Sequence, residues 1–274
     1  MELLTFSGRG TGLATRLGVV LLAAALLLSF ALLAAPAGAR RAQIGHLIVS
    51  LDAGFSPQRL PRHRLAPVSI SVSGLLGTDD GSPLPRLRGI EIALASGSSR
   101  LDARGLPSCP RRELLSATER QGLERCSDTL VGRGVLRAEV DIPGQIPFLL
   151  RASVLAFNGG ARGARAVVWL LAFSSAPPAS FLVPVFIRHR PGPLGTNLTG
   201  VLPPSLGPWP HVSAFHITFT RHFVYRGALH SYLSASCPVP PRFTGGLLPF
   251  ARARYFFNAA PTITTTVARS CHVR

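Results

Sequence analysis

Residues 214–225 read AFHITFTRHFVY, and this stretch indicates the fold class. One parity of it is apolar and holds Phe215, Ile217, Phe219, Phe223 and Tyr225. The other parity is mostly polar and holds His216, Thr218, Thr220 and His222. Successive side chains of a strand point to opposite faces, so this period predicts a long strand or a hairpin with an aromatic inner face.

Other stretches repeat the pattern. Residues 68–73, 90–94 and 136–142 alternate in the same way, which predicts strands with one buried face. Three further runs are mostly or wholly apolar and are expected to be central strands covered on both faces: 147–157, 166–173 and 181–187. Pro184 favours an edge position for the last run. With Gly- and Pro-rich turns between the runs, the sequence predicts a mainly β fold of antiparallel sandwich-like domains.

One segment has helical character. Residues 110–125 read PRRELLSATERQGLER, with Pro110 suited to a first helical turn and Ser116-x-x-Glu119 resembling a capping box. The two signals place the helix start differently. Either start puts a short helix between two cysteines.

The four cysteines predict two disulfides. Cys109, Cys126, Cys237 and Cys271 are the cysteines of the chain. We predict the bonds Cys109–Cys126 and Cys237–Cys271, because each closes a local loop. Tetrahedral zinc is the alternative, but no C-x-x-C spacing occurs.

The first 39 residues carry the parts of a secretory signal in order. A positively charged start and an apolar run over 17–35 come first, followed by Ala37 and Ala39 in a cleavage motif. We predict a signal peptide over 1–39 that is cleaved after Ala39, which places the mature protein outside the cell or in the cell envelope. An uncleaved anchor is the alternative, because the run approaches the ~20 apolar residues that span a bilayer.

All 29 basic residues are arginines, and their balance with carboxylates changes along the chain. Residues 40–141 contain 15 Arg and 11 Asp or Glu, whereas residues 142–274 contain 12 Arg and no carboxylate side chain. We expect two β-rich parts with these bounds, in one domain or two. The second part forms a field of one sign that attracts anionic lipid or cell-wall polyanions, with nucleic acid a weaker candidate for an exported chain. Codon bias toward arginine is the alternative explanation.

Four arginines are candidates for polyanion contact because they flank strand-like runs with aromatic neighbours. They are Arg221, Arg226, Arg252 and Arg254. We expect them to cluster on one face if the charge is functional.

Residues that could support catalysis or bind a metal are sparse. The paired carboxylates of glycosidases would have to come from 52–141, where Asp79 and Asp80 sit in a turn. His216 and His222 would lie about 20 Å apart on a straight strand, too far for one metal ion, although a hairpin bend would bring them closer. The sequence lacks the H-E-x-x-H, Walker, G-x-S-x-G and dinucleotide motifs, so we predict no catalytic residues, metal site or cofactor.

The order of several landmarks resembles a group of exported proteins from high-GC bacteria whose activity is not known. The landmarks are LPSCP (106–110), a helix to Cys126, FNGG (157–160), FTRHFVYRGALHSYLSASCP (219–238) and a last cysteine near the end of the chain. The resemblance implies an export signal, a β-rich fold and paired cysteines, and it implies no activity.

The sequence therefore favours an exported, non-catalytic protein that binds or supports something at the cell envelope. An exported hydrolase with a Ser/His site is one alternative, and a module anchored in the membrane through residues 17–35 is another. The ligand and the oligomeric state are left open.

Overall fold

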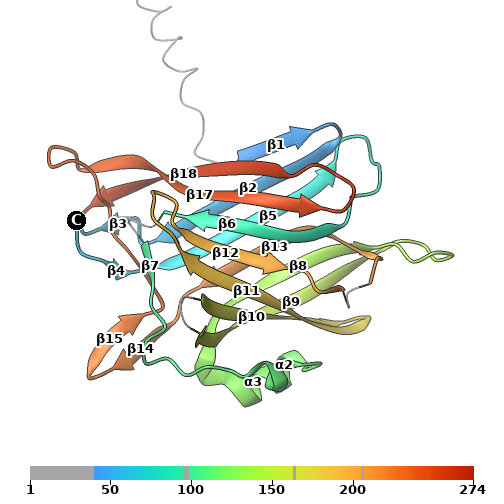
Figure 1. The fold of residues 1–274 in the computed structure, drawn as a ribbon, viewed down its shortest axis with the longest axis horizontal. Helices are drawn as coiled ribbons and strands as arrows, with labels where there is room; N and C mark the ends of the chain where they lie inside the picture. Colours follow the sequence, from blue (N-terminus) through green and yellow to red (C-terminus); the bar gives the residue numbers. More distant parts are fainter. Residues whose placement is uncertain (1–39, 96–98, 163–164, 205–206) are drawn as a thin grey trace, which may run out of the picture. The chain divides into compact units, whose positions relative to one another are not determined.

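Alternating apolar residues form long strands in the part of the chain that the computed structural model describes, residues 40–95, 99–162, 165–204 and 207–274 (Figure 1). The predicted signal peptide over 1–39 lies outside the described residues. Most of the described strands hydrogen-bond side by side in one sheet of 13 strands. In sheet order these are β1 (Arg40–Ile44), β2 (Leu47–Ser56), β5 (Ser69–Thr78), β13 (Pro210–Phe219), β8 (Leu130–Val140), β9 (Phe148–Arg162), β10 (Arg165–Ser175), β11 (Pro178–His189), β12 (Thr196–Val201), β6 (Leu87–Leu94), β17 (Gly245–Phe257), β18 (Ile263–Val273) and β3 (Arg59–Leu60). The pairs are antiparallel except β18 with β3.

Strands from the two expected parts of the chain alternate in this sheet. Strand β13 of the second part pairs with β5 and β8 of the first. Strand β6 of the first part pairs with β12 and β17 of the second. Residues 39–274 accordingly form one compact unit.

The sheet curls until its two ends approach each other. Cα atoms of β18 come within 8 Å of those of β1 and β2. The hydroxyl of Tyr255 on β17 donates a hydrogen bond to the Ser50 carbonyl of β2 at 3.0 Å. From β18, Nε of Arg269 donates to the Ala53 carbonyl at 2.7 Å, and the same guanidinium pairs with Asp52. These bonds fasten β2 to β17 and β18 across the seam.

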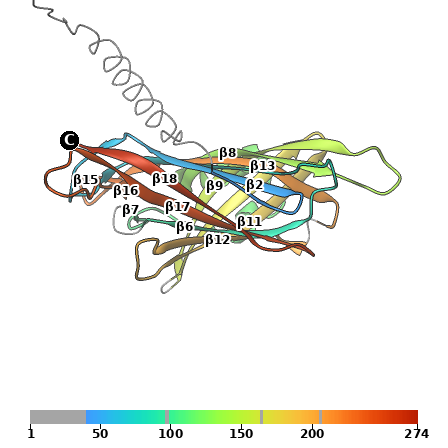
Figure 2. The same ribbon diagram turned by 90° about the horizontal axis from the view of Figure 1, so that it is seen from above.

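The curl changes the predicted sandwich. In place of two separate sheets, a single continuous sheet supplies both facing layers, as the turned view shows (Figure 2). Right-handed twist accumulates from strand to strand, so a sheet with this many strands bends back over itself.

Strand β13 confirms the predicted alternation. Phe215 is buried, His216 is exposed, and Ile217 packs against the apolar interior. The strand ends at Phe219. The next stretch forms a separate hairpin of β14 (His222–Tyr225) and β15 (Ala228–Ser231).

The three apolar runs are central strands, as predicted, and Pro184 is not in an edge strand. Strand β11 pairs with β10 on one side and β12 on the other. The prediction of an edge was wrong because Pro184 lies just beyond the β12 ladder, which begins at Val185. The missing N–H group is therefore tolerated at a place where the neighbouring strand has ended.

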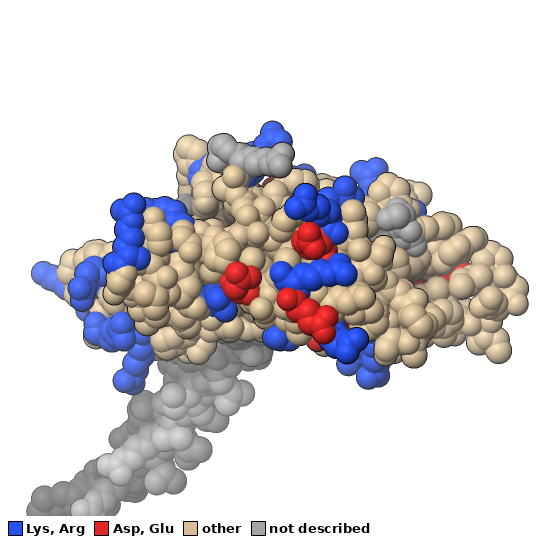
Figure 3. Space-filling view, turned by 90° about the horizontal axis from the view of Figure 1, so that it is seen from below, with Lys and Arg blue, Asp and Glu red and all other residues tan. Residues whose placement is uncertain are grey.

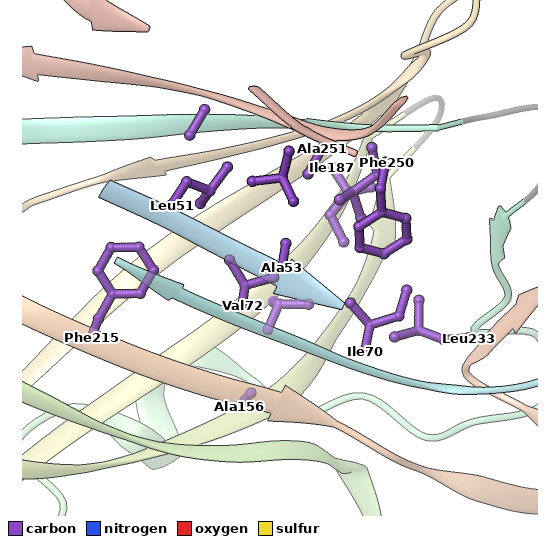
Figure 4. Close-up of a cluster of buried hydrophobic side chains, with 14 of the residues drawn as sticks. Leu51, Ala53, Ile70, Val72, Ala156, Ile187, Phe215, Leu233, Phe250 and Ala251 are labelled. Carbon is purple, nitrogen blue, oxygen red and sulfur yellow. The ribbon is translucent and has the colours of Figure 1, made fainter. Parts of the chain in front are cut away.

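Apolar side chains from both layers pack together in the interior. Figure 4 shows Leu51 and Ala53 of β2, Val72 of β5 and Phe215 of β13 in one cluster with residues of β17. Across this core the rings of Phe55 and Phe250 lie 5.3 Å apart, between centroids. The burial of this cluster is the main stabilising contribution to the curled sheet.

The predicted helix is two short helices with a break between them. They are α2 (Arg111–Leu114), which follows Pro110, and α3 (Glu119–Cys126), which continues into the 3-10 turn η1 (Ser127–Thr129). The capping box is Thr118 with Gln121, whereas Ser116 adopts a positive φ of 56° in the break. The expected Ser116–Glu119 box was therefore wrong, and the two start signals belong to two helices.

Both predicted disulfides are present, Cys109–Cys126 and Cys237–Cys271. The first bond holds α2 and α3 against the outer face of β9 and β10, where the helices pack on Leu155, Phe157 and Leu171. The second ties β18 to the segment that follows a small three-stranded sheet of β4 (Ala66–Pro67), β16 (Leu233–Ala235) and β7 (Ser99–Leu101).

Candidate functional site

The curled sheet contains a partly open cavity of about 150 Å³. Strands β5, β6 and β8 through β13 contribute its walls, and β7 and β16 contribute to one end. The walls are almost entirely apolar and include Ile92, Leu170, Val185, Leu198, Phe215 and Ile217. Side chains from both expected parts of the chain meet here.

The cavity follows from the same two-residue period that built the strands. On β11, Val183, Val185 and Ile187 line it, while the residues between them face away. Some wall residues have short side chains or none, including Ala172 of β10 and the glycines Gly89 and Gly200 on the neighbouring strands β6 and β12. Short side chains on facing layers do not meet in the middle, so the two layers leave a space.

Polar groups gather at the end of the cavity formed by β7, β16 and the first residue of β12. Thr196 lines the cavity and its Oγ1 lies 3.2 Å from Nδ1 of His189, which is exposed. Arg100 of β7 lines the same end and is exposed. Tyr232 lies beside β16 and is fully buried, and this burial raises the pKa of its phenol, so the group stays neutral.

The Ser/His arrangement of a hydrolase gains no support from the described residues. Hydroxyl contacts with histidine occur there at His189–Thr196 and His216–Thr218, both with threonine. Ser99 at the cavity end donates to the Ala95 carbonyl. Among the wall residues that the structure describes, none is a carboxylate that could orient a histidine.

His216 and His222 lie on different elements, β13 and β14, and belong to different sheets. The described residues instead bring together an exposed group that the sequence did not predict. It consists of His46, Asp79 and Asp80, whose ligand atoms all lie within 4.8 Å of one another.

The side chains of this exposed group already form hydrogen bonds with one another and with neighbouring residues of the chain. Nδ1 of His46 lies 2.9 Å from Asp79, and Nε2 of Gln43 donates to the same carboxylate at 2.6 Å. The hydrogen bond to Asp79 and the charge of Asp80 raise the pKa of His46. Hydrogen bonds from Ser82 lower the pKa of Asp80. The contacts fasten the turn between β5 and β6 to the turn between β1 and β2.

The four arginine candidates do not form one cluster. Arg252 and Arg254 lie on the outer face of β17, and Arg254 pairs with Glu91 at 3.7 Å. Arg221 precedes β14 and donates to the Asp128 carbonyl at 3.0 Å. Arg226 is in the β14–β15 turn, stacked over Tyr225, away from β17 (Figure 1).

Strand register groups a different set of arginines on the outer surface. Arg165 of β10 is opposite Arg188 of β11, which is opposite Asn197 of β12. The row continues through Ala93 of β6 to Arg252 of β17. Acidic side chains are interspersed with arginines near the middle of the face shown in Figure 3. The sequence alone does not predict the row of Arg165, Arg188 and Arg252, because its members come from strands that are far apart in the sequence.

In the described part of the chain, no helix is long and apolar enough to cross a membrane. The apolar run over 17–35 lies outside that part. Neither a protein-family model nor a curated protein nor a solved structure matches this chain.

Proposed function

We propose that this protein is a non-catalytic exported binding protein that holds a small apolar ligand inside its curled sheet. The observation that carries the proposal is the apolar cavity of about 150 Å³ between the two layers of the sheet. An apolar cavity of this size stays free of water and takes up molecules with about six carbon atoms. Burial of such a ligand is favourable because it removes the apolar surface of the ligand from water and fills the space with van der Waals contacts.

The wall chemistry favours binding over catalysis. An active site for hydrolysis needs a nucleophile, a base and a group that orients the base. The described walls offer apolar side chains, with hydroxyls and the arginine Arg100 at one end. The hydrolase alternative would need a serine–histidine contact within this cavity.

The export component of the proposal rests on the sequence of residues 1–39 and on the two disulfides. Paired cysteines are typical of oxidising compartments. Cleavage after Ala39 and retention as an anchor are the two fates of the apolar run. Mass spectrometry of the exported chain distinguishes them, since cleavage leaves Arg40 as the first residue.

The binding test compares a phenylalanine introduced inside the cavity with a phenylalanine introduced on the other side of the same strand. Leu198 of β12 lines the cavity, and the next residue, Thr199, faces the other side of the strand. We expect octan-1-ol to bind the native protein and to raise its melting temperature with ligand concentration. Leu198→Phe fills the space and should abolish this shift, while Thr199→Phe should retain it.

Leu198→Ala provides a second check, because it enlarges the space and should keep binding. Circular dichroism confirms that each variant is folded before titration. An absent shift in the native protein, or an unchanged shift in Leu198→Phe, would contradict the proposal.

The row of Arg165, Arg188 and Arg252 favours a second function, contact with an anionic polymer of the cell envelope. Two of its members are directly opposite each other, an arrangement that is unfavourable without counter-charge. An anionic polymer laid across β10 to β17 would supply that charge.

A further inference from the structure

The end of the cavity next to β7 carries positive charge. Arg100 and Thr196 line it, and Oγ1 of Thr196 is hydrogen-bonded to Nδ1 of His189 at 3.2 Å. Arg188 and Arg190 flank His189 on the same strand end and are exposed. We call Arg100 and Thr196 the cationic rim, after the charge of the arginine.

Among the described residues, the carboxylate that interacts with the charge of Arg100 is Asp102, whose pKa is lowered mainly by its hydrogen bond with Arg104 and to a smaller extent by Arg100. Asp102 is two residues from Arg100, but its carboxylate is bound by Arg104 at 2.6 Å. Within the described residues, no carboxylate lies within 4.0 Å of the guanidinium groups of Arg100, Arg188 or Arg190. The rim therefore keeps hydrogen-bond donors and positive charge available at the polar end of an otherwise apolar space.

From this placement we infer that the cavity selects an anionic amphiphile, with its apolar chain inside and its head group at the cationic rim. The inference rests on the proposed function, and it adds the ligand's chemical class. A guanidinium offers several donors in a planar fork that matches a carboxylate or phosphate. The hydroxyl of Thr196, which lines the same space, is hydrogen-bonded to Nδ1 of His189, and its own hydrogen is free for a ligand when Nδ1 is the donor of that bond.

The size of the cavity fits a short chain. About six carbon atoms fill about 150 Å³. An eight-carbon chain would therefore place its head group, and the carbon atoms next to that head group, at the rim. Octanoate, octan-1-ol and octylammonium share this chain and differ in head-group charge, so they separate the rim from the cavity.

The experiment is calorimetric titration of the native protein with these three probes at low and physiological salt. We expect octanoate to bind about fivefold more tightly than octan-1-ol, and octylammonium to bind most weakly. Arg100→Gln should remove the preference for octanoate and leave octan-1-ol unchanged. Arg100→Lys should restore part of the preference.

Arg137→Gln is the matched control, because it removes the same charge from the outer face of β8 and should keep the preference. Equal binding of octanoate and octan-1-ol, or an unchanged preference in Arg100→Gln, would overturn the cationic rim and leave the apolar binding function standing. Failure of all three probes to bind would overturn both.

Discussion

Gly74 on β5 shows how closely single residues approach inside the curled sheet. A Cβ atom at this position would lie 2.4 Å from the Phe215 ring and 3.1 Å from the Tyr255 hydroxyl. That hydroxyl is the donor of the seam bond to Ser50. Because Gly74 has no side chain, the Phe215 ring of β13 and the Tyr255 hydroxyl that closes the seam can both pack against β5.

Two glycines of the same strand provide the test at this scale. Gly74→Ala should lower the free energy of unfolding by about 1–3 kcal/mol, because the Phe215 ring has to move. Gly77→Ala, where nothing lies within 4 Å of the added atom, should be neutral or slightly stabilising. Urea denaturation of both variants measures the difference, and equal effects would contradict the close contact.

At the scale of elements, the helical excursion depends on where its second helix begins. Thr118 accepts from the Gln121 N–H at 3.2 Å, and the Gln121 side chain accepts from the Thr118 N–H at 2.9 Å. Leu114 and Ala117 are buried between the two helices and the sheet. The helical segment is interrupted so that both apolar residues are buried. The N-cap of the second helix is therefore Thr118, two residues after Ser116, which the sequence favoured.

The cap can be located by paired substitutions. Thr118→Ala should lower the free energy of unfolding by about 0.5–2 kcal/mol, because the first turn of α3 loses its side-chain acceptor. Ser116→Ala removes a hydroxyl from the exposed break and should have a much smaller effect. Thermal melts compare the two, and a larger loss at Ser116 would mean that the helix starts earlier.

At the scale of the whole molecule, the curl gives the sheet two outer faces that each carry a row of arginines. One row contains Arg165, Arg188 and Arg252. The other contains Arg41 of β1, Arg137 of β8 and Arg151 of β9, brought into line by the register through β2, β5 and β13. Each row has three arginines and one directly opposed pair, Arg165 with Arg188 and Arg137 with Arg151, so the second row is the competing contact site that the test has to separate from the first.

Replacing Arg165, Arg188 and Arg252 together with glutamine should remove most of the binding to a poly(glycerol phosphate) wall polymer. The native interaction should weaken steeply between low salt and about 0.15 M, because exposed charges are screened over about 8–10 Å. The matched triple substitution of Arg41, Arg137 and Arg151 should retain it. Equal losses in both triple variants would indicate general charge attraction, and no binding at low salt would contradict the partner.

Local patterns were enough to predict much of this fold. The two-residue period at 214–219 correctly placed Phe215 inside and His216 outside, and loop closure gave both disulfides. These features depend on neighbours in the sequence or on the short reach of a cross-link. The split helix also had both of its start signals in the sequence, although their assignment to two helices needed the packing of Leu114.

The tertiary structure alone decided the curl, the cavity and the arginine rows. Period two says which residues share a face, but it does not say which strands become neighbours or how far the twist carries them. Leu198, Phe215 and Val185 meet around one space only because β13 and β12 are on facing layers of one sheet. Long-range pairing of strands, which local sequence does not encode, therefore created the candidate site.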